Sequence, residues 1–192
     1  TSGKIGAPAP GNKGHYAQYL DGKGLRERFR DDYEQRNATR KTSLGDCHPS
    51  VLDVEDYHDE WVSRTANDWL DAVSTDQPFY LSVNWAGPHA FRDAPGRYAR
   101  MYDPAKVDPP IVDPLTNAPE ALRQRQRTTL DKLGAEDWRG IRASYYGMVS
   151  LLDDGIGRML ATLERRGLLE ETVVVYAADH GEMLCDHGFV YK

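Results

Sequence analysis

The residues best suited to chemistry lie near the end of the sequence, directly behind an apolar run. The run VVVYAA is followed by Asp179, His180 and a glycine. A carboxylate beside an imidazole can hold a divalent cation from one side, and a hard cation such as Ca²⁺, Mg²⁺ or Mn²⁺ would need further oxygen ligands. A capping Asp and a packed His at a turn would use the same two residues, so the spacing alone leaves both interpretations open.

Two further residues could act on an anionic substrate. His89 lies in the segment NWAGPHAFRDAP, and Lys192 closes the sequence. Because an imidazole titrates near neutral pH, His89 could donate to an anion or act as general acid to a leaving oxygen. Lys192 could place a point charge on a tetrahedral oxyanion. The alternatives are an exposed loop histidine and an ordinary surface lysine.

The cysteines raise the possibility of a zinc site and of a cysteine nucleophile, but the sequence favours neither. Cys185, His187 and His180 could offer soft zinc ligands, but their spacing fits neither a two-Cys knuckle nor a helical His pair, and a fourth ligand is lacking. His187 fits a loop-ordering role better, and Asp186 could cap the turn. Cys47 begins the segment CHPS, which resembles a nucleophile motif but lies in a polar loop with no strand before it.

The composition indicates a folded protein of one domain or a large part of one. The 192 residues are 40% hydrophobic and 28% charged, with a formal net charge of −6. The negative charge argues against nucleic acid or an anionic membrane as a general partner. No run reaches the ~20 apolar residues of a membrane span. Two cysteines exclude a disulfide-dense scaffold and leave a single bridge open.

Two periodic segments are predicted to be helices that position the candidates. Residues 55–74 place Val62, Ala66, Trp69 and Val73 at spacings of four, three and four, which indicates an amphipathic helix of about 17 residues with an acidic first turn. A helix of about 27 residues, ending at Gly167, is predicted within residues 138–167 from the apolar positions Ile141, Tyr145, Val149, Leu152, Ile156, Leu160 and Leu163.

Two apolar runs next to these helices are predicted to be strands. Residues 79–85 (FYLSVNW) are short, aromatic and β-branched, and residues 172–178 form a continuous apolar run typical of a parallel strand buried on both faces. Strand, helix and strand in this order predict a right-handed crossover in an α/β layer fold. Ligands in such folds collect at the carboxyl ends of the strands, where His89 and Asp179 with His180 would lie.

The remaining segments are predicted to be more irregular. Residues 1–14 are expected to form a loop, and residues 15–36 a short helix broken at Gly22 and Gly24. Residues 92–137 are Pro-rich and then charged, with at most one helix after Pro119, and are predicted to be an insertion over the edge of the sheet.

The sequence resembles the sulfatase family of the alkaline phosphatase superfamily. The resemblance rests on PFYLSVNWAGPHAFRDAPGRYARMYDP and on YYGMVSLLDDGIGRMLATLERRGLLEETVVVYAADHGEMLCDHGFVYK, and it covers residues 55–110 and 139–192. The block ADHGEMLCDHG is similar to the subgroup with choline sulfatases and phosphonate or phosphate monoester hydrolases. The fold implied is a three-layer α/β/α sandwich with a mostly parallel sheet, present here in incomplete form.

The resemblance also implies roles for individual residues. Asp179 and His180 match two metal ligands, His89 matches the histidine that contacts the sulfate or the leaving oxygen, and Lys192 matches the lysine that binds the sulfate. The implied cofactor is a divalent metal, Ca²⁺ in first place and Mn²⁺ or Mg²⁺ as alternatives. The implied nucleophile is a formylglycine made from Cys or Ser in a C-x-P-S-R motif.

The sequence departs from the family pattern at the nucleophile. Val51 stands where the arginine of that motif would follow Cys47, so the formylglycine is expected outside these residues. Residues 1–192 are therefore expected to be the central part of one sulfatase domain, without its N-terminal nucleophile strand and its C-terminal subdomain. Such a piece on its own is expected to be inactive.

The implied activity is hydrolysis of a small-molecule or carbohydrate sulfate ester. The alternatives are a phosphonate, phosphate monoester or phosphate diester hydrolase of the same superfamily, and a non-catalytic α/β binding module. The resemblance leaves the substrate and the oligomeric state open. A bacterial cytoplasm or periplasm is expected as the compartment.

Overall fold

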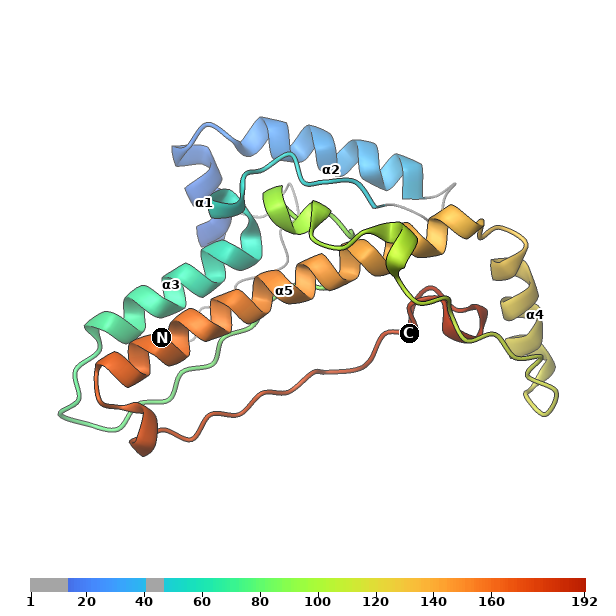
Figure 1. The fold of residues 1–192 in the computed structure, drawn as a ribbon. Helices are drawn as coiled ribbons and strands as arrows, with labels where there is room; N and C mark the ends of the chain where they lie inside the picture. The colour runs from blue at the N-terminus through green and yellow to red at the C-terminus, as the bar shows by residue number, and fades with distance from the viewer. Residues whose placement is uncertain (1–13, 41–46) are drawn as a thin grey trace.

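The computed structural model describes residues 14–40 and 47–192 (Figure 1). Its α-helices are α1 (His15–Gly22), α2 (Arg26–Arg40), α3 (His58–Ala72), α4 (Glu120–Leu130) and α5 (Ala135–Arg165). Its 3₁₀ helices are η1 (Val54–Asp56), η2 (Gly96–Arg100), η3 (Pro104–Lys106), η4 (Leu169–Glu171) and η5 (Asp186–Gly188). The loop predicted for residues 1–14 lies almost wholly outside the described residues.

Helices α3 and α5 pack side by side and form the centre of the structure (Figure 1). Their shared core contains Ala66 and Leu70 from α3 and Met159 and Leu163 from α5. The periodicity predicted α3 correctly but assigned Trp69 to its buried face. Leu70 is 3% exposed and Trp69 is 40% exposed. Leu70 takes this place because it follows Ala66 by four residues, which puts both on one stripe of the helix.

The long helix α5 agrees with its prediction at the C-terminal end and is longer at the N-terminal end. Its last residue is Arg165, and Gly167 has a φ of +68°, the left-handed conformation expected after a helix. Its first turn begins at Ala135 because the Asp137 carboxylate reaches back and accepts the backbone N–H of Gly134 at 2.8 Å. The apolar periodicity contains no sign of this polar first turn.

The region predicted as one broken helix forms two helices. The break falls between Gly22 and Arg26, and Gly24 has a φ of +68°. Helix α1 buries Tyr16 and Leu20 against Leu52, whereas α2 is polar and continues to the limit of the described segment.

The predicted sheet is not confirmed. Residues 79–85 and 172–178 run as extended chain (Figure 1), but no strand pairing is present within residues 14–40 and 47–192. A strand needs a neighbour for its ladder of backbone hydrogen bonds, and neither segment has one among these residues. The burial predicted for the second segment is also not observed, since Val173 is 89% exposed and Val175 is 80% exposed. The first segment turns Phe79, Leu81, Val83 and Trp85 toward the core of α3 and α5.

The single helix predicted after Pro119 is α4, which begins at Glu120. It packs against η5 and the turn around it, where Gln126 Nε2 donates to the carbonyl oxygens of Asp113 at 2.7 Å and His187 at 3.0 Å. In the part of the chain that the structure describes, no helix is both long enough and apolar enough to cross a membrane.

Candidate active site

An open groove runs along the two extended segments and one face of α5. It is lined by residues 75–91, by residues 171–182 and by apolar side chains of α5. Three of the predicted residues line this groove: His89, Asp179 and His180. The fourth, Lys192, reaches it through a contact with His180.

Asp179, His180 and Lys192 form one polar cluster. Lys192 Nζ lies 2.8 Å from His180 Nε2, and Asp179 Oδ2 lies 3.4 Å from the same nitrogen. The backbone N–H of His180 donates to Asp179 Oδ1 at 3.0 Å. The cluster is open to solvent, since the Asp179 side chain is 87% exposed. The structure therefore brings together three of the four predicted residues.

The contacts of His180 define which ring nitrogen is available to a ligand. Its Nδ1 lies 2.8 Å from the carbonyl oxygen of Gly181, which can only accept, so Nδ1 carries the proton. Nε2 then carries a lone pair, which accepts from Lys192 and which a metal could bind in place of that contact. Histidines that bind metals commonly donate their other ring N–H to a carbonyl in this way.

The donors present fit part of a metal site. Asp179 supplies a carboxylate and His180 an unprotonated ring nitrogen, both directed to one side. No group of three or more His, Cys, Asp or Glu side chains that could hold a metal occurs among the described residues. A divalent cation here would therefore need further ligands in addition to this pair.

His89 lies in the groove apart from this cluster. Its Nδ1 is 2.7 Å from the carbonyl oxygen of Ala90, which leaves Nε2 free to meet a ligand. Among the described residues, His89 makes no hydrogen bond or ion pair with Asp179, His180 or Lys192. His89 and the cluster of Asp179, His180 and Lys192 are connected only in that they lie along the same groove.

The turn that carries His89 is held by Asp59 on α3. The two carboxylate oxygens of Asp59 accept the backbone N–H groups of Ala86 and Gly87, each at 2.9 Å. The sequence pattern treated Asp59 only as an acidic residue in the first turn of a helix. No local signal in the sequence connects it with a turn 27 residues later.

Arg92 connects the His89 segment to the C-terminal block. It is 1% exposed, and its Nη2 donates to the carbonyl oxygen of Val190 at 3.1 Å and lies 3.9 Å from Glu182 Oε1. Its guanidinium also lies 5.1 Å from the centre of the Tyr191 ring, within the range of a cation–π contact. The peptide next to Lys192 is therefore tied to the segment that follows His89.

The second Asp-His pair belongs to a structural turn. Asp186 Oδ1 accepts from Arg142 Nη2 at 2.5 Å and from the backbone N–H of Ile111 at 2.7 Å. His187 Nδ1 lies 2.7 Å from Asp113 Oδ2, in an ion-pair contact without hydrogen-bond geometry. The turn requires left-handed backbone at Cys185 and His187, with φ values of 74° and 53°. These contacts agree with the loop-ordering role predicted for His187. The capping role suggested for Asp186 is not observed, because η5 has no side-chain cap and Asp186 binds Arg142 and Ile111 instead.

Neither cysteine has the surroundings of a nucleophile. Cys185 is buried against Ile141 and Val190, and this burial raises the pKa of its thiol to about 11. Cys47 is half-buried against the same cluster, with its Sγ 3.9 Å from the position of a Cβ added to Gly140. The two cysteines are not joined by a disulfide.

The arrangement of the chain is similar to that of solved phosphonate monoester hydrolases. The phosphonate monoester hydrolase of Agrobacterium radiobacter superposes on 93% of this chain with a TM-score of 0.65 and 21% sequence identity, and the match covers 38% of that protein. At this identity the likeness concerns the fold.

The sequence is similar to curated sulfatases. It is 28% identical to an arylsulfatase of Clostridium perfringens over 134 residues, or 69% of this chain and 28% of that protein. It is 27% identical to a choline-sulfatase of Rhizobium meliloti over 174 residues, or 85% of this chain and 33% of that protein. The chain thus spans a third or less of the length of these relatives. The sulfatase family model matches residues 6–191, and the chain therefore belongs to the sulfatase family.

Proposed function

We propose that this chain is part of an enzyme that hydrolyses sulfate esters with the help of a divalent metal. The observation that carries the proposal is the cluster at the C-terminal end of the groove. The Nε2 of His180 lies between the other two groups there, 2.8 Å from the Lys192 ammonium and 3.4 Å from the Asp179 carboxylate. Such a set can serve a cation and an anion at once, as hydrolysis of a charged ester requires.

Each residue has a separate role in the proposed reaction. Lys192 stabilises the negative charge on the transferred sulfuryl group, and the Nε2 of His89 gives a proton to the oxygen of the departing alcohol. Asp179 and His180 bind the metal, which supplies charge neutralisation at the sulfate oxygens when bound. The Nδ1 contact of His89 with the Ala90 carbonyl supports this assignment, because it leaves Nε2 without a protein partner in that contact. The proton leaves Nε2 from the imidazolium form of the ring, in which both nitrogens carry a proton, and Nδ1–H stays bonded to the carbonyl.

Ca²⁺ is the metal we propose, since the carboxylate of Asp179 is a hard oxygen ligand. The nucleophile we propose is a formylglycine hydrate that does not arise from Cys47 or Cys185. This is supported by the buried, high-pKa thiol of Cys185 and by the packing of Cys47 in the same apolar cluster.

A phosphonate or phosphate ester hydrolase is the second candidate. It is favoured by the likeness in fold to the phosphonate monoester hydrolases of Agrobacterium radiobacter and Silicibacter pomeroyi. Sulfate and phosphonate monoesters share tetrahedral anionic geometry, so the same lysine and metal would serve either group. A non-catalytic binding module would keep the groove and show no turnover.

The deciding experiment compares esters with one leaving group. Turnover of a nitrophenyl sulfate, a nitrophenyl phosphonate and a nitrophenyl phosphate diester is measured in the intact protein with and without added Ca²⁺. We expect the highest kcat/KM for the sulfate and a loss of about 100-fold in Lys192→Ala. Lys106→Ala is the matched control, because Lys106 is an exposed lysine whose ion pair is with Asp103. A preference for the phosphonate would establish the second candidate, and no turnover of any ester would contradict both.

A further inference from the structure

We propose that Asp59 is the positioning residue of His89: its carboxylate fixes the turn from which His89 faces the groove. This inference rests on the role proposed for His89 as the proton donor to the leaving group. Asp59 itself is among the residues that line the groove and is 2% exposed.

The first step of the argument is the contact between carboxylate and turn. Asp59 Oδ1 accepts the N–H of Ala86 and Oδ2 accepts the N–H of Gly87, both at 2.9 Å. Two adjacent backbone donors on two oxygens of one carboxylate fix both the position and the orientation of the peptide between them. The approach is so close that a Cβ on Gly87 would lie 2.3 Å from Asp59 Oδ2. Only glycine fits this position beside the carboxylate.

The second step connects this peptide to His89. The carbonyl oxygen of Ala86 accepts the backbone N–H of His89 at 3.3 Å. Ala86 is therefore held through its N–H by Asp59 and holds His89 through its carbonyl. A shift of the Ala86 peptide would move the backbone of His89 with it.

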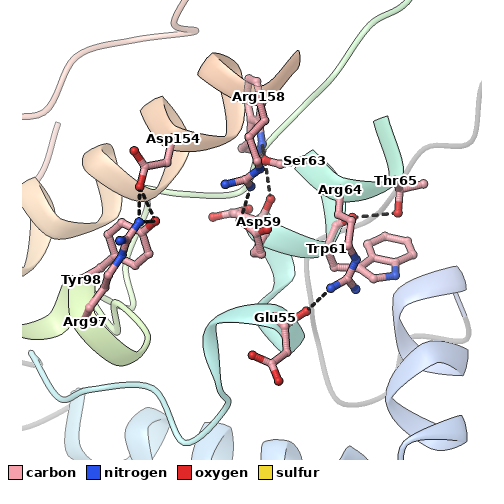
Figure 2. A network of polar contacts seen from close by, with 12 residues as sticks. Glu55, Asp59, Trp61, Ser63, Arg64, Thr65, Arg97, Tyr98, Asp154 and Arg158 are labelled. Carbon is pink, nitrogen blue, oxygen red and sulfur yellow. Dashed lines mark hydrogen bonds and ion pairs between the residues drawn. The ribbon is translucent and has the colours of Figure 1, made fainter. Parts of the chain in front are cut away.

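The third step is the rigidity of Asp59. Its Oδ1 also lies 3.0 Å from His58 Nδ1, and the His58 ring meets the Tyr16 ring edge to face at 4.9 Å between centres. The carboxylate is thus held against His58, whose ring packs on α1. One turn later, Ser63 Oγ donates to the backbone carbonyl oxygen of Asp59 at 2.9 Å, a contact within the helix that does not involve the carboxylate (Figure 2).

Ser63 offers a matched control on the same helix. It is also 2% exposed, and its Oγ accepts the Trp85 Nε1–H at 2.9 Å. Ser63 therefore holds a side chain of the residue directly before the turn, whereas Asp59 holds the backbone of the turn itself. Removal of either bond weakens a buried contact between α3 and the segment 79–89, but only Asp59 acts on the peptide that binds His89.

The kinetic test uses the intact protein and a series of aryl sulfates whose phenol leaving groups differ in pKa. A well-placed general acid reduces the dependence of the rate on the leaving group, because it neutralises the developing oxyanion. In Asp59→Asn we expect kcat/KM to fall less than about threefold for a nitrophenyl sulfate and about 30-fold or more for unsubstituted phenyl sulfate. His89→Ala should show the same steeper dependence, and the double variant should add little to it.

Two results would overturn the proposal. One is an Asp59→Asn variant that loses the same factor for every leaving group, which would indicate a purely structural role. The other is a Ser63→Ala variant with the same steeper dependence as Asp59→Asn. Asp59→Glu keeps the charge but displaces the oxygens, and it should give a smaller change of the same kind. It also serves as the variant to measure if Asp59→Asn does not fold.

NMR spectroscopy tests the positioning without any substrate, so its failure can be distinguished from that of the proposed function. In the wild-type protein the amide protons of Ala86 and Gly87 should exchange slowly and resonate downfield. In the Asp59 variants both features should be lost, and the ring resonances of His89 should shift with them. Amide protons that exchange as fast in the wild type as that of the exposed Asn84, or a His89 ring unaffected by the variants, would contradict the proposal.

Discussion

The dipeptide Asp-His occurs twice within nine residues, and the two copies have opposite surroundings. Asp179 and His180 are exposed and contact each other, and His180 also contacts Lys192. Asp186 and His187 are taken up by neighbours, with the Asp186 carboxylate bound to Arg142 and to the backbone of Ile111. The carboxylate of Asp179 is exposed and can still bind a ligand, whereas Oδ1 of Asp186 already accepts two hydrogen bonds.

This contrast shows that residue type and spacing do not distinguish a site from a structural turn. The first pair follows an extended segment at the edge of a groove, and within residues 14–40 and 47–192 the polar contacts of its ring nitrogen Nε2 are with Lys192 and Asp179. The second pair packs against α4, where Gln126 Nε2 donates to the carbonyl oxygen of His187. The number of protein partners already bound to each carboxylate and imidazole is the physical difference.

The largest effect is expected at the first pair. Asp179→Asn and His180→Ala should each reduce kcat/KM for an aryl sulfate by about 1000-fold, because each removes a proposed metal ligand. The thermal midpoint without metal should stay within about 2 °C of the wild type, since both side chains are exposed. The rise of the midpoint on addition of Ca²⁺ should disappear. Unchanged turnover in either variant would contradict the assignment of the first pair to the site.

The pH dependence of stability should be dominated by a carboxylate outside both pairs, Asp93, and its effect must be subtracted before the two pairs are compared. Burial raises its pKa from 3.8 to about 6, against the opposing effects of Arg36 and the hydrogen bond from Tyr57. The folded protein then binds this proton more tightly than the unfolded chain does. The free energy of unfolding should fall by at most about 3 kcal/mol as the pH rises from about 4 to 6, and then level off.

Urea unfolding at a series of pH values measures this slope. Asp93→Asn should remove it, and the remaining pH dependence can then be assigned to other groups, the two pairs among them. An Asp93→Asn variant with the same slope as the wild type would show that Asp93 does not titrate in this range.

A smaller effect, on stability alone, is expected at the second pair. Asp186→Ala leaves the guanidinium of Arg142, which is 7% exposed, without its carboxylate, and it also removes the acceptor of the Ile111 N–H. We expect a loss of about 2 kcal/mol in the free energy of unfolding. The apparent affinity for Ca²⁺, measured by calorimetry, should change less than about threefold. Asp179→Ala is the control, with unchanged stability and lost affinity.

The smallest effect is expected for His187→Ala. Its contact with Asp113 is half-exposed and lacks hydrogen-bond geometry, so its loss should cost less than about 1 kcal/mol. The backbone bond from His187 to the carbonyl of Ile111 is retained in the variant. Turnover equal to the wild type would sharpen the contrast with His180→Ala. A loss of turnover similar to that of His180→Ala would mean that both pairs belong to the site.

The helices could be predicted from the sequence because their signals are local. The apolar stripe of α5 and its end at Gly167 agree with the structure, as does the start of α4 after Pro119. The sheet could not be established in this way. A β-branched run predicts extended backbone, and residues 172–178 are extended, but strand pairing depends on neighbours remote in the sequence, and none is present among the described residues.

In the candidate site, too, the contacts between residues close in the sequence could be predicted and those between distant residues could not. Asp179, His180 and Lys192 lie within 14 positions of one another, and the structure brings them into contact. The supports of His89 could not be found from its own segment. Asp59 lies on the preceding helix, and Arg92 makes its contacts with a block that begins at Glu182 and includes Val190, 98 residues later. Such contacts follow from tertiary packing and leave no periodic or motif signal.

The exposed run from Val173 to Tyr176 has a practical consequence for handling these 192 residues. It is uncharged and β-branched, and its backbone groups have no partner strand among the described residues, which are the properties of a segment that recruits further copies edge to edge. Glu170 and Glu171 precede the run and Asp179 follows it, so charges flank it on both sides and oppose such stacking. While the run is uncovered, Asp179 therefore contributes to solubility, and variants at this position should be compared at low protein concentration.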